Sequence, residues 1–567
     1  MCERKPSPSI KIDVELPPSG GATRGTVFIP INAQGTPTEL GSGRSAQVFL
    51  AQRTPPAPEL DSSQTEFVAI KCLLDDENEQ YARSLELRFD CEKDGAKHFS
   101  VHANTFIRYL GEGTLSQKSG QKELMKNYGL RGPFYVMDLA YCTLNDLLDT
   151  SVSWPTLPAY QALPHAQEAL KKSQDYYADD IKSFASNFLD LDPINTSPSG
   201  YEILRAFKTT REAELVRTNA VLQVVLEIVY LIKQLHAETD IKPRLCHRDI
   251  KPGNILLTHA INPGGIDSFR LRLSDLGGVA NEGQLRGGEA TFRVDGWRTP
   301  GATAPGSEFY RAPEQAAHPR EVRLSIQGTR AVVKGSKLPE IGVGDWIAVV
   351  GGQHDGSGAS AERYQRVTEV ERCNGVYHIV LANKLPVTGD DVVGFVIKGT
   401  GFHTDGYSVG AILYDLLTGG RNPEQFYTYC IRMYDRWSNQ SIESVDALVE
   451  VLLGKRWLPK FQISELLTDT RGKVLPRIIL TDIVRCMTRD ISSSYYQVTA
   501  DGFLGEANGD AMANLERSLL AAMSAEHYPC PASVPPSLRD DLLLKLRCFW
   551  PCPQTVSLRA MQTEDSG

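Results

Sequence analysis

Short apolar runs bounded by turn-forming residues predict strands in the first quarter of the chain. Residues 47–51 and 66–73 are two such runs, separated by a loop that contains Pro and Ser, and residues 134–139 form a third. Residues 77–98 are charged, but their apolar positions recur at helical spacing. This region is therefore expected to hold three strands and one helix. Residues 26–31, within an otherwise flexible arm, are a candidate for a further strand.

A strong helical pattern marks residues 213–237. Its apolar residues recur at intervals of three and four, at Leu215, Leu222, Val225, Leu226, Val229, Ile232 and Leu235. The segment before it, residues 150–210, mixes aromatic and acidic positions, and we interpret it as an insertion with some helix.

The pattern changes in residues 320–400, where short apolar runs alternate with turns such as Asn374-Gly375. Strands at this spacing predict a small all-β domain, either a sandwich or a barrel. Helical periodicity returns at residue 408 and continues to residue 523.

The composition restricts the class of protein. The chain has 567 residues, too many for one ordinary domain, and its 41% hydrophobic and 23% charged residues are typical of a globular protein. The net charge of −9 argues against nucleic acid as a partner, because affinity for phosphate backbones comes from clustered Lys and Arg. No apolar run approaches the ~18 residues of a membrane span, so no membrane partner is expected.

The cysteines and the first residues indicate the compartment. The 11 cysteines are scattered without a C-x-x-C pair, a pattern typical of reduced thiols. The N-terminal residues are polar and lack the apolar core of a secretory signal. We therefore expect a cytoplasmic protein.

The strongest chemical signal is the segment 247–254, His-Arg-Asp-Ile-Lys-Pro-Gly-Asn. It places a carboxylate (Asp249), an ammonium group (Lys251) and an amide (Asn254) in one short loop. Phosphoryl transfer needs a carboxylate to orient the attacking hydroxyl, a cation near the transferred group and an oxygen ligand for magnesium. A turn around a core histidine is the alternative interpretation.

Two glycines and a lysine add phosphate-binding chemistry. Gly41 and Gly43 lie between two predicted strand segments, where backbone N–H groups can approach phosphates without side-chain obstruction. Taken alone, they also fit an ordinary hairpin turn. Lys71 lies in an apolar strand and needs an anionic partner, because an unpaired buried charge is costly. The glutamates of the predicted helix at residues 77–98 are candidates for that partner, and a solvated helix face is the alternative.

Three more segments follow in order. Asp275 comes after an apolar run and is suited to hold a magnesium ion that bridges nucleotide phosphates. The tripeptide Ala-Pro-Glu stands at 312–314, and the helix start Asp-Gly-Tyr-Ser-Val-Gly stands at 405–410.

In this order the segments resemble the motifs of the eukaryotic-like Ser/Thr protein kinase family. The resemblance covers roughly residues 39–318 and 402–500. It implies an α+β, two-lobed protein-kinase fold, with a β-rich small lobe, a mainly helical large lobe and an inserted small all-β domain. The implied domains are a flexible N-terminal arm (1–38), the small lobe (39–140), the first part of the large lobe (141–318), the inserted β-rich domain (319–401), the second part of the large lobe (402–505) and a C-terminal extension (506–567).

The resemblance also implies a role for each site residue. The catalytic residues would be Asp249, Lys251, Lys71 and Glu92. Glu92 would be the partner of Lys71, with Glu86 as the second candidate for that role. Mg²⁺ would be bound by Asn254 and Asp275. ATP would be bound by Gly41, Gly43, Val48, Ala69, Lys71, Met137, Asp138, Ala140 and Leu256. The implied activity is transfer of the γ-phosphoryl group of ATP to a Ser or Thr hydroxyl of a protein substrate.

Several positions depart from the family pattern. Leu276 replaces the usual phenylalanine, and the turn at 263–265 indicates an inserted hairpin. An arginine partner for Glu314 is not evident, because Ser494 stands at its expected place. The long segment after Asp275 contains candidate phosphorylation sites at Thr291, Thr299, Thr303 and Ser307.

The largest departure is the β-rich segment 319–401. Our hypothesis is that it recruits a substrate or partner, and an elaboration without binding function is the alternative. Two other functions stay open for the whole chain. One is a pseudokinase scaffold that binds nucleotide or partners without turnover, which the presence of every key polar residue disfavours. The other is a small-molecule phosphotransferase of related fold.

Overall fold

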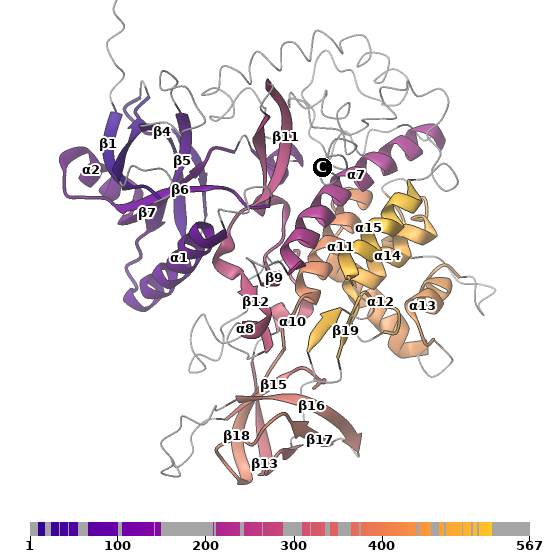
Figure 1. The fold of residues 1–567 in the computed structure, drawn as a ribbon. Coiled ribbons are helices and arrows are strands. Elements are labelled where there is room, and N and C mark those ends of the chain that lie inside the picture. The colour runs from indigo at the N-terminus through magenta and orange to yellow at the C-terminus, as the bar shows by residue number, and fades with distance from the viewer. Residues whose placement is uncertain are drawn as a thin grey trace, which may run out of the picture. The chain divides into compact units, whose positions relative to one another are not determined.

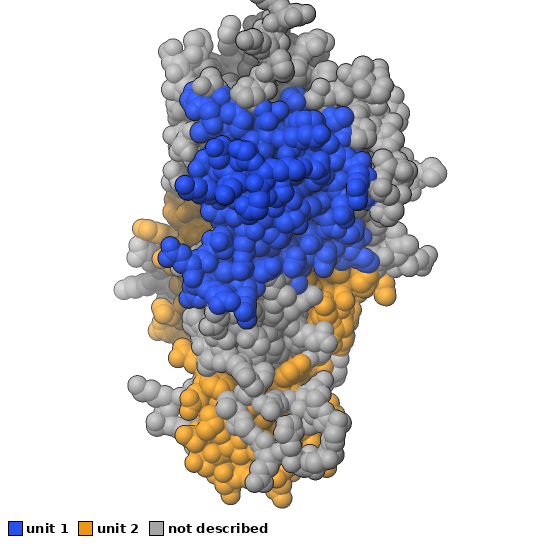
Figure 2. Space-filling model, turned by 90° about the vertical axis from the view of Figure 1, so that its left-hand side faces the viewer, with its two compact units in different colours: residues 1–224, 252–277, 528–567 blue, residues 225–251, 278–527 orange. Residues whose placement is uncertain are grey.

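The chain forms two units in the computed structural model (Figure 2). Unit 1 comprises residues 1–224, 252–277 and 528–567, and unit 2 comprises residues 225–251 and 278–527. The residues that the structure describes are 9–17, 24–32, 34–43, 45–54, 66–99, 105–140, 142–148, 208, 211–238, 243–262, 265–286, 309–317, 319–334, 341–349, 364–373, 376–437, 442–454, 464–469, 472–489, 491–499, 503–506 and 510–523. The insertion expected at 150–210 lies outside them except for residue 208, and so do the four candidate phosphorylation sites.

A closed antiparallel barrel forms much of unit 1 (Figure 1). In order around the barrel, its strands are β2 (Arg24–Pro30), β1 (Ser9–Glu15), β6 (Tyr109–Thr114), β7 (Leu130–Asp138), β5 (Glu66–Leu74) and β4 (Ala46–Thr54). The last three residues of β4 pair with β2 and close the barrel. The first half of β4 pairs with a seventh strand, β3 (Glu39–Ser42).

Alternate residues of these strands fill the barrel. A single buried apolar cluster includes Ile12, Val14, Val27, Ile29, Phe49, Ala51, Val68, Ile70, Cys72, Phe134 and Val136. Because successive side chains of a strand point to opposite faces, the residues between these positions face outward. Lys71 of β5 therefore lies on the outer face of the barrel. Among the described residues, the same unit also contains helices α1 (Glu79–Phe99) and α2 (Ser119–Tyr128).

This architecture shows that the predicted two-lobed protein-kinase fold is wrong. The structure instead has two closed six-stranded antiparallel barrels, one in each unit. In unit 1 the difference arises because the expected flexible arm at residues 1–38 contains two strands that close the sheet. These are β1 and β2, of which only β2 overlaps the candidate strand at 26–31. Closure pairs N–H and C=O groups that would otherwise line open sheet edges.

A small sheet also belongs to unit 1. It pairs β8 (Cys142–Thr143) with β10 (Ile255–Asn262), and β10 with β11 (Gly265–Leu273). Strands β10 and β11 form a hairpin at the place where the sequence indicates one. Backbone hydrogen bonds of Leu273 with Thr105 and Ile107 join this hairpin to the barrel. The other short elements here are α3 (Leu144–Leu148) and the 3-10 turns η3 (Pro252–Asn254) and η4 (Leu276–Gly278).

Unit 2 contains α11 (His403–Thr418), every residue of which is buried. Helix α7 (Arg211–His236) belongs to this unit from residue 225 onward. The other described helices of the unit are α8 (Glu282–Arg286), α10 (Pro313–Ala316), α12 (Pro423–Trp437), α13 (Val445–Leu452), η6 (Glu465–Leu467), α14 (Arg477–Met487) and α15 (Ala511–Ala522). Two short sheets pair β9 (Leu245–Cys246) with β12 (Ala280–Asn281), and β19 (Tyr496–Val498) with β20 (Leu504–Glu506). None of the helices that the structure describes combines the length and the apolar character needed to cross a membrane.

The segment expected to be all-β forms the second barrel. In order around it, the strands are β13 (Arg320–Gln327), β14 (Arg330–Lys334), β17 (Val376–Leu381), β16 (Tyr364–Cys373), β15 (Trp346–Val349) and β18 (Gly389–Ile397). Alternate residues Val322, Leu324 and Ile326 of β13 point into its apolar core. Where the chain leaves β18, Lys398 forms an ion pair of 2.7 Å with the buried carboxylate of Asp345.

We expect Gly410→Ala to destabilise unit 2. A Cβ atom at residue 410 would lie 2.7 Å from Cys486 Cβ and 2.9 Å from Met487 Cγ, so α11 and α14 would have to move apart. Overpacking of this kind costs about 1–3 kcal/mol of unfolding free energy. Urea denaturation should show this loss, whereas Gly120→Ala in α2, whose Cβ would meet Ile10 at an ordinary 3.5 Å, should not. Equal stability of the two variants would contradict the prediction.

Candidate active site

Lys71 forms an ion pair with Glu92 of α1 on the outer face of the unit 1 barrel. Lys71 Nζ lies 2.5 Å from Glu92 Oε1, and the two side chains are 15% and 5% exposed. Glu86, the second candidate from the sequence, pairs instead with Arg131 at 3.0 Å and is 45% exposed. The structure therefore places Glu92, and not Glu86, at Lys71.

Tyr135 is a third member of this cluster. Its hydroxyl donates a hydrogen bond of 2.7 Å to Glu92 Oε1. In the strand register, Tyr135 of β7 lies directly opposite Lys71 of β5. Sequence reasoning missed this residue. The signal was present, because Tyr135 stands two residues before Met137 in a strand and so shares its face.

The charges of the cluster keep Lys71 protonated. Burial lowers the pKa of the Lys71 ammonium group, but the negative charges of Glu92 and Asp275 outweigh burial, so the pKa of Lys71 is raised. Burial raises the pKa of Glu92, while the charge and hydrogen bond of Lys71 and the hydrogen bond of Tyr135 oppose that rise. Lys71 is therefore a fixed cation suited to bind anionic oxygens.

The segment from Asp275 to Gly277 passes close to α1. Leu276 is buried, and a Cβ atom at Gly95 of α1 would lie 3.3 Å from Leu276 Cβ. A Cβ atom at Gly277 would lie 3.4 Å from the backbone oxygen of Arg88. Asp275 itself has a φ of 60°, which is uncommon for a residue other than glycine. This packing holds Asp275 near the ion pair of Lys71.

Asn254 is hydrogen-bonded to Ser274, the residue that precedes Asp275. Its backbone oxygen accepts hydrogen bonds from the N–H of Ser274 at 3.0 Å and from the Ser274 hydroxyl at 3.2 Å. Asn254 is itself buried. Amide and carboxylate oxygens are ligands that Mg²⁺ uses together with substrate phosphates and water. No group of three His, Cys, Asp or Glu side chains suited to a metal ion occurs in the part of the chain that the structure describes.

Three apolar candidates for nucleotide binding share the outer barrel face with Lys71. Val48 of β4 lies directly opposite Lys71. Ala69 stands two residues before Lys71 and lies opposite Met137 of β7. Residues opposite one another in an antiparallel pair project to the same side, so these side chains form one surface.

The other candidates lie at the rim of that surface and in the adjoining sheet. Gly41 is opposite Val48, and a Cβ atom there would meet open space. The N–H of Gly43 donates to the Ala46 oxygen at 2.9 Å, which closes the turn between β3 and β4. The carboxylate of Asp138 is bound by Arg108 at 3.0 Å, and Ala140 is half-buried. Leu256 of β10 pairs with Thr143 of β8.

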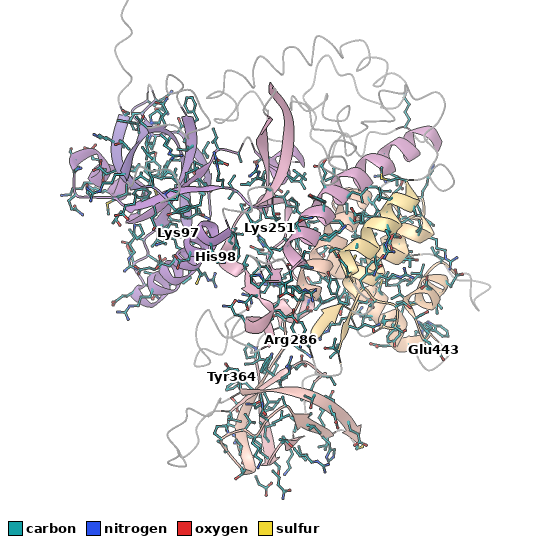
Figure 3. The ribbon with its side chains drawn as sticks, viewed as in Figure 1. Lys97, His98, Lys251, Arg286, Tyr364 and Glu443 are labelled. Carbon is teal, nitrogen blue, oxygen red and sulfur yellow. The ribbon has the colours of Figure 1, made fainter. Side chains whose placement is uncertain are left out.

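Asp249 and Lys251 lie in unit 2 (Lys251 is labelled in Figure 3). Lys251 Nζ is 3.2 Å from Asp249 Oδ2, and the side chains are 28% and 15% exposed. The backbone N–H of Asp249 donates to Nδ1 of the fully buried His247 at 3.3 Å. The loop therefore carries a carboxylate and an ammonium group close together, and the hydrogen bond to His247 holds its backbone.

Asp405, in the first turn of α11, anchors this loop. Its two carboxylate oxygens accept the backbone N–H groups of His247 and Arg248, each at 2.7 Å. His236 Nε2 lies 3.0 Å from Oδ2 of the same carboxylate. Burial alone would raise the pKa of Asp405, but the hydrogen bond and charge of His236 and the bond from His247 outweigh it and lower that pKa. Asp405 thus stays ionised and holds the loop.

Arg248 is buried and has a φ of 67°, a strained conformation for a non-glycine residue. Its Nε donates to the oxygen of Gly278 at 2.6 Å, and its own backbone oxygen accepts from Gln315 Nε2 at 2.6 Å. Together with Asp405, these bonds maintain the strained backbone that precedes Asp249.

Glu314 has partners that the sequence did not reveal. His403 Nδ1 lies 2.8 Å from Glu314 Oε1, and Arg489 Nη1 lies 3.9 Å from Oε2. Ser494, the residue at the expected place of an arginine, instead shares a hydrogen bond with the Thr488 hydroxyl. Burial would raise the pKa of Glu314, but His403 and Arg489 more than reverse this and lower it to about 2.

No protein-family model matches this chain, and no curated protein shows significant similarity to it. The chemistry of the site is therefore inferred from its own residues and their geometry.

A double-mutant cycle should show that Tyr135 and Glu92 are coupled. Tyr135→Phe removes a hydrogen bond to a charged acceptor and should cost about 1–3 kcal/mol, and Glu92→Gln should cost about 3–5 kcal/mol because it leaves Lys71 unpaired. Measured by urea denaturation, the double variant should lose less than the sum of the two. Tyr128→Phe, whose ring packs edge-on against Phe49, is the control and should add to Glu92→Gln. Additivity for Tyr135 would refute the coupling.

The stability that Glu314 confers should disappear in acid. Its folded pKa of about 2 lies below the ordinary 4.5, so its contribution is present above pH 4.5 and is lost as the pH falls toward 2. At about 1.4 kcal/mol per pKa unit, Glu314→Gln should cost roughly 3 kcal/mol at pH 6. Urea denaturation of both proteins at pH 6 and pH 3.5 should show a smaller difference at pH 3.5. An unchanged difference would count against the ion pair.

Proposed function

We propose that this protein is an ATP-dependent protein kinase that phosphorylates Ser or Thr hydroxyls of a protein substrate. The observation that carries the proposal is the buried pair of Lys71 and Glu92, with Tyr135 bound to it and Asp275 beside it. A buried ion pair adds little to stability compared with apolar side chains of the same size. Its presence on a sheet face lined by small apolar residues is better explained by a ligand with both an apolar and an anionic part, as a nucleotide has.

The overall fold gives this proposal no support, because its two closed barrels differ from the architecture that the sequence resemblance implies. Function depends on the residues of a site more than on the fold that presents them. The proposal therefore rests on the local arrangement of the polar groups.

In unit 1, we assign the nucleotide to the outer barrel face. Val48, Ala69 and Met137 would contact the base, and Lys71 would bind the phosphates. Asn254 and Asp275 would hold Mg²⁺, which when bound neutralises negative charge on the phosphates.

In unit 2, we assign phosphoryl transfer to Asp249 and Lys251. Asp249 would accept the proton of the substrate hydroxyl as its oxygen forms a bond to the γ-phosphorus. The bond from that phosphorus to the β–γ bridging oxygen breaks, and ADP leaves with the electron pair. Lys251 would stabilise the charge on the transferred group.

The two sets of residues are joined by a very short piece of chain. Asp249 and Asn254 are five residues apart in the sequence. A cytoplasmic location is also part of the proposal. Among the side chains that the structure describes, the cysteines are free thiols: Cys72, Cys91, Cys246, Cys373, Cys430 and Cys486.

The test is a transfer assay with the full-length protein, labelled ATP and Mg²⁺, alone and with a generic protein substrate. We expect label on Ser or Thr, and a loss of about 100-fold or more in Asp249→Ala and Lys71→Met. The matched controls are Asp390→Ala, which removes an exposed carboxylate, and Lys97→Met, which removes a lysine paired with Glu112. Both controls should retain the activity of the unmodified protein.

Label that persists in Asp249→Ala at the original rate would refute the assignment. Nucleotide binding without transfer by the unmodified protein would favour a scaffold that lacks turnover. Label on a small-molecule acceptor, and none on protein, would favour a small-molecule phosphotransferase.

A further inference from the structure

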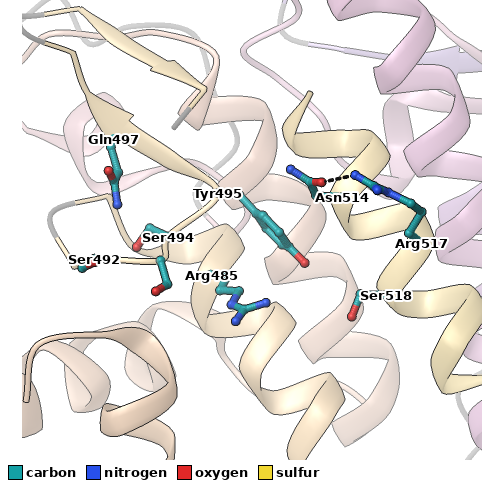
Figure 4. Close-up of a pocket in the computed structure, with 9 residues that line it drawn as sticks. Arg485, Ser492, Ser494, Tyr495, Gln497, Asn514, Arg517 and Ser518 are labelled. Carbon is teal, nitrogen blue, oxygen red and sulfur yellow. Dashed lines mark hydrogen bonds between the residues drawn. The ribbon is translucent and has the colours of Figure 1, made fainter. Parts of the chain in front are cut away.

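A polar pocket of about 570 Å³ lies in unit 2, and none of its lining residues is assigned to phosphoryl transfer (Figure 4). Helix α14 contributes Arg485, and helix α15 contributes Asn514, Arg517 and Ser518. The remaining lining residues come from the turn before β19 and from that strand: Ser492, Ser493, Ser494, Tyr495 and Gln497. The lining thus combines two guanidinium groups with hydroxyl and amide groups.

Both arginines retain unused donors. Arg485 donates to Asp446 Oδ2 at 2.8 Å, but its Nε has no hydrogen-bond partner. Arg517 is exposed and bonds only within its own helix, to the oxygen of Ala513 and to the Asn514 side chain. Among the ion pairs of the described residues, none includes Arg517. The pocket therefore holds at least one cation that no carboxylate neutralises.

The nearby acidic groups are engaged elsewhere. Asp482 is buried, and its two oxygens accept hydrogen bonds from the Tyr495 and Ser518 hydroxyls, each at 2.7 Å. Glu516 pairs with Lys233 at 2.8 Å. Asp446 is the acidic group that offsets part of the positive charge of the pocket, through its bond to Arg485.

The serine-rich turn adds neutral donors. Ser492 is exposed and Ser493 half-buried, and neither hydroxyl makes a hydrogen bond within the part of the chain that the structure describes. Ser493 has a φ of 74°, so the turn is held in a conformation that is strained for a non-glycine residue. These hydroxyls stand in the same pocket as the two arginines.

We propose that this pocket binds a phosphomonoester, either on a phosphorylated Ser or Thr side chain or on a small metabolite. A phosphate dianion has several acceptor oxygens and forms short, charge-assisted bonds with guanidinium groups, which matches this lining. A pocket of about 570 Å³ falls within the range of small-molecule sites and exceeds what a lone phosphate ion fills. The ester therefore carries further atoms, which the amides of Gln497 and Asn514 are placed to contact. The proposal is independent of the proposed kinase activity.

The test measures binding to the full-length chain at fixed, low ionic strength. One arm follows the fluorescence anisotropy of a labelled peptide library with a central phosphothreonine, beside the same library with threonine. The other arm uses calorimetry with O-phospho-L-serine and with inorganic phosphate. Preferential binding of the phosphorylated library supports a protein ligand, and binding of O-phospho-L-serine without the library supports a metabolite. Equal binding of the two libraries, with no binding of the small ester, would overturn the proposal, and so would binding of inorganic phosphate alone.

Two variants test whether the phosphomonoester binds in this pocket. Arg517 is exposed, so Arg517→Gln should fold normally and weaken ester binding by about tenfold or more. Arg436→Gln, which removes an exposed arginine of α12 outside the pocket, is the matched control and should bind as the unmodified protein does. Equal affinities of the two variants would exclude this pocket as the site. Circular dichroism of both variants checks that they are folded.

Discussion

A buried lysine must have a negative partner, and the pair of Lys71 and Glu92 meets that requirement in unit 1. The pair joins α1 to the barrel, because Lys71 belongs to β5 and Glu92 belongs to α1. Tyr135 and the segment that begins at Asp275 then pack around the same two charges. Removing either charge would leave the other buried and unpaired, at a cost of about 3–5 kcal/mol.

Unit 2 uses the opposite charge in a similar way. The buried carboxylate of Asp405 accepts hydrogen bonds from two backbone N–H groups and contacts a histidine. These bonds help to hold Arg248 in a strained conformation. The same bonds determine the backbone conformation of the loop that carries Asp249 and Lys251. In each unit, a buried ionised group is stabilised by several partners, and the side chains proposed to act on the substrate stand next to it.

The barrel of unit 1 shows why the predicted fold failed. The first strand, Ser9–Glu15, has alternating burial, and its sequence alternates polar and apolar residues. The composition of the surrounding residues nevertheless suggests a flexible arm. What makes it a strand is the pairing of all seven of its residues with the next strand, β2, together with a single contact of Glu15 with Glu112 of β6. Closure likewise depends on β2 and β4, whose pairing leaves no trace in either segment alone.

The sequence by itself determined the chemical identity and order of the candidate site, the alternation that places Lys71 outside the barrel, the hairpin of β10 and β11, and the long helix before the loop of Asp249. These features are local, because a motif, a period or a turn is complete within a short stretch of chain. Only the tertiary structure decided that Glu92 rather than Glu86 meets Lys71, and that Tyr135 joins them. It also decided that His403 and Arg489 face Glu314, and that the two six-stranded sheets close into barrels. Each of these depends on which distant residues come together when the apolar faces are buried, and a single sequence leaves that choice open.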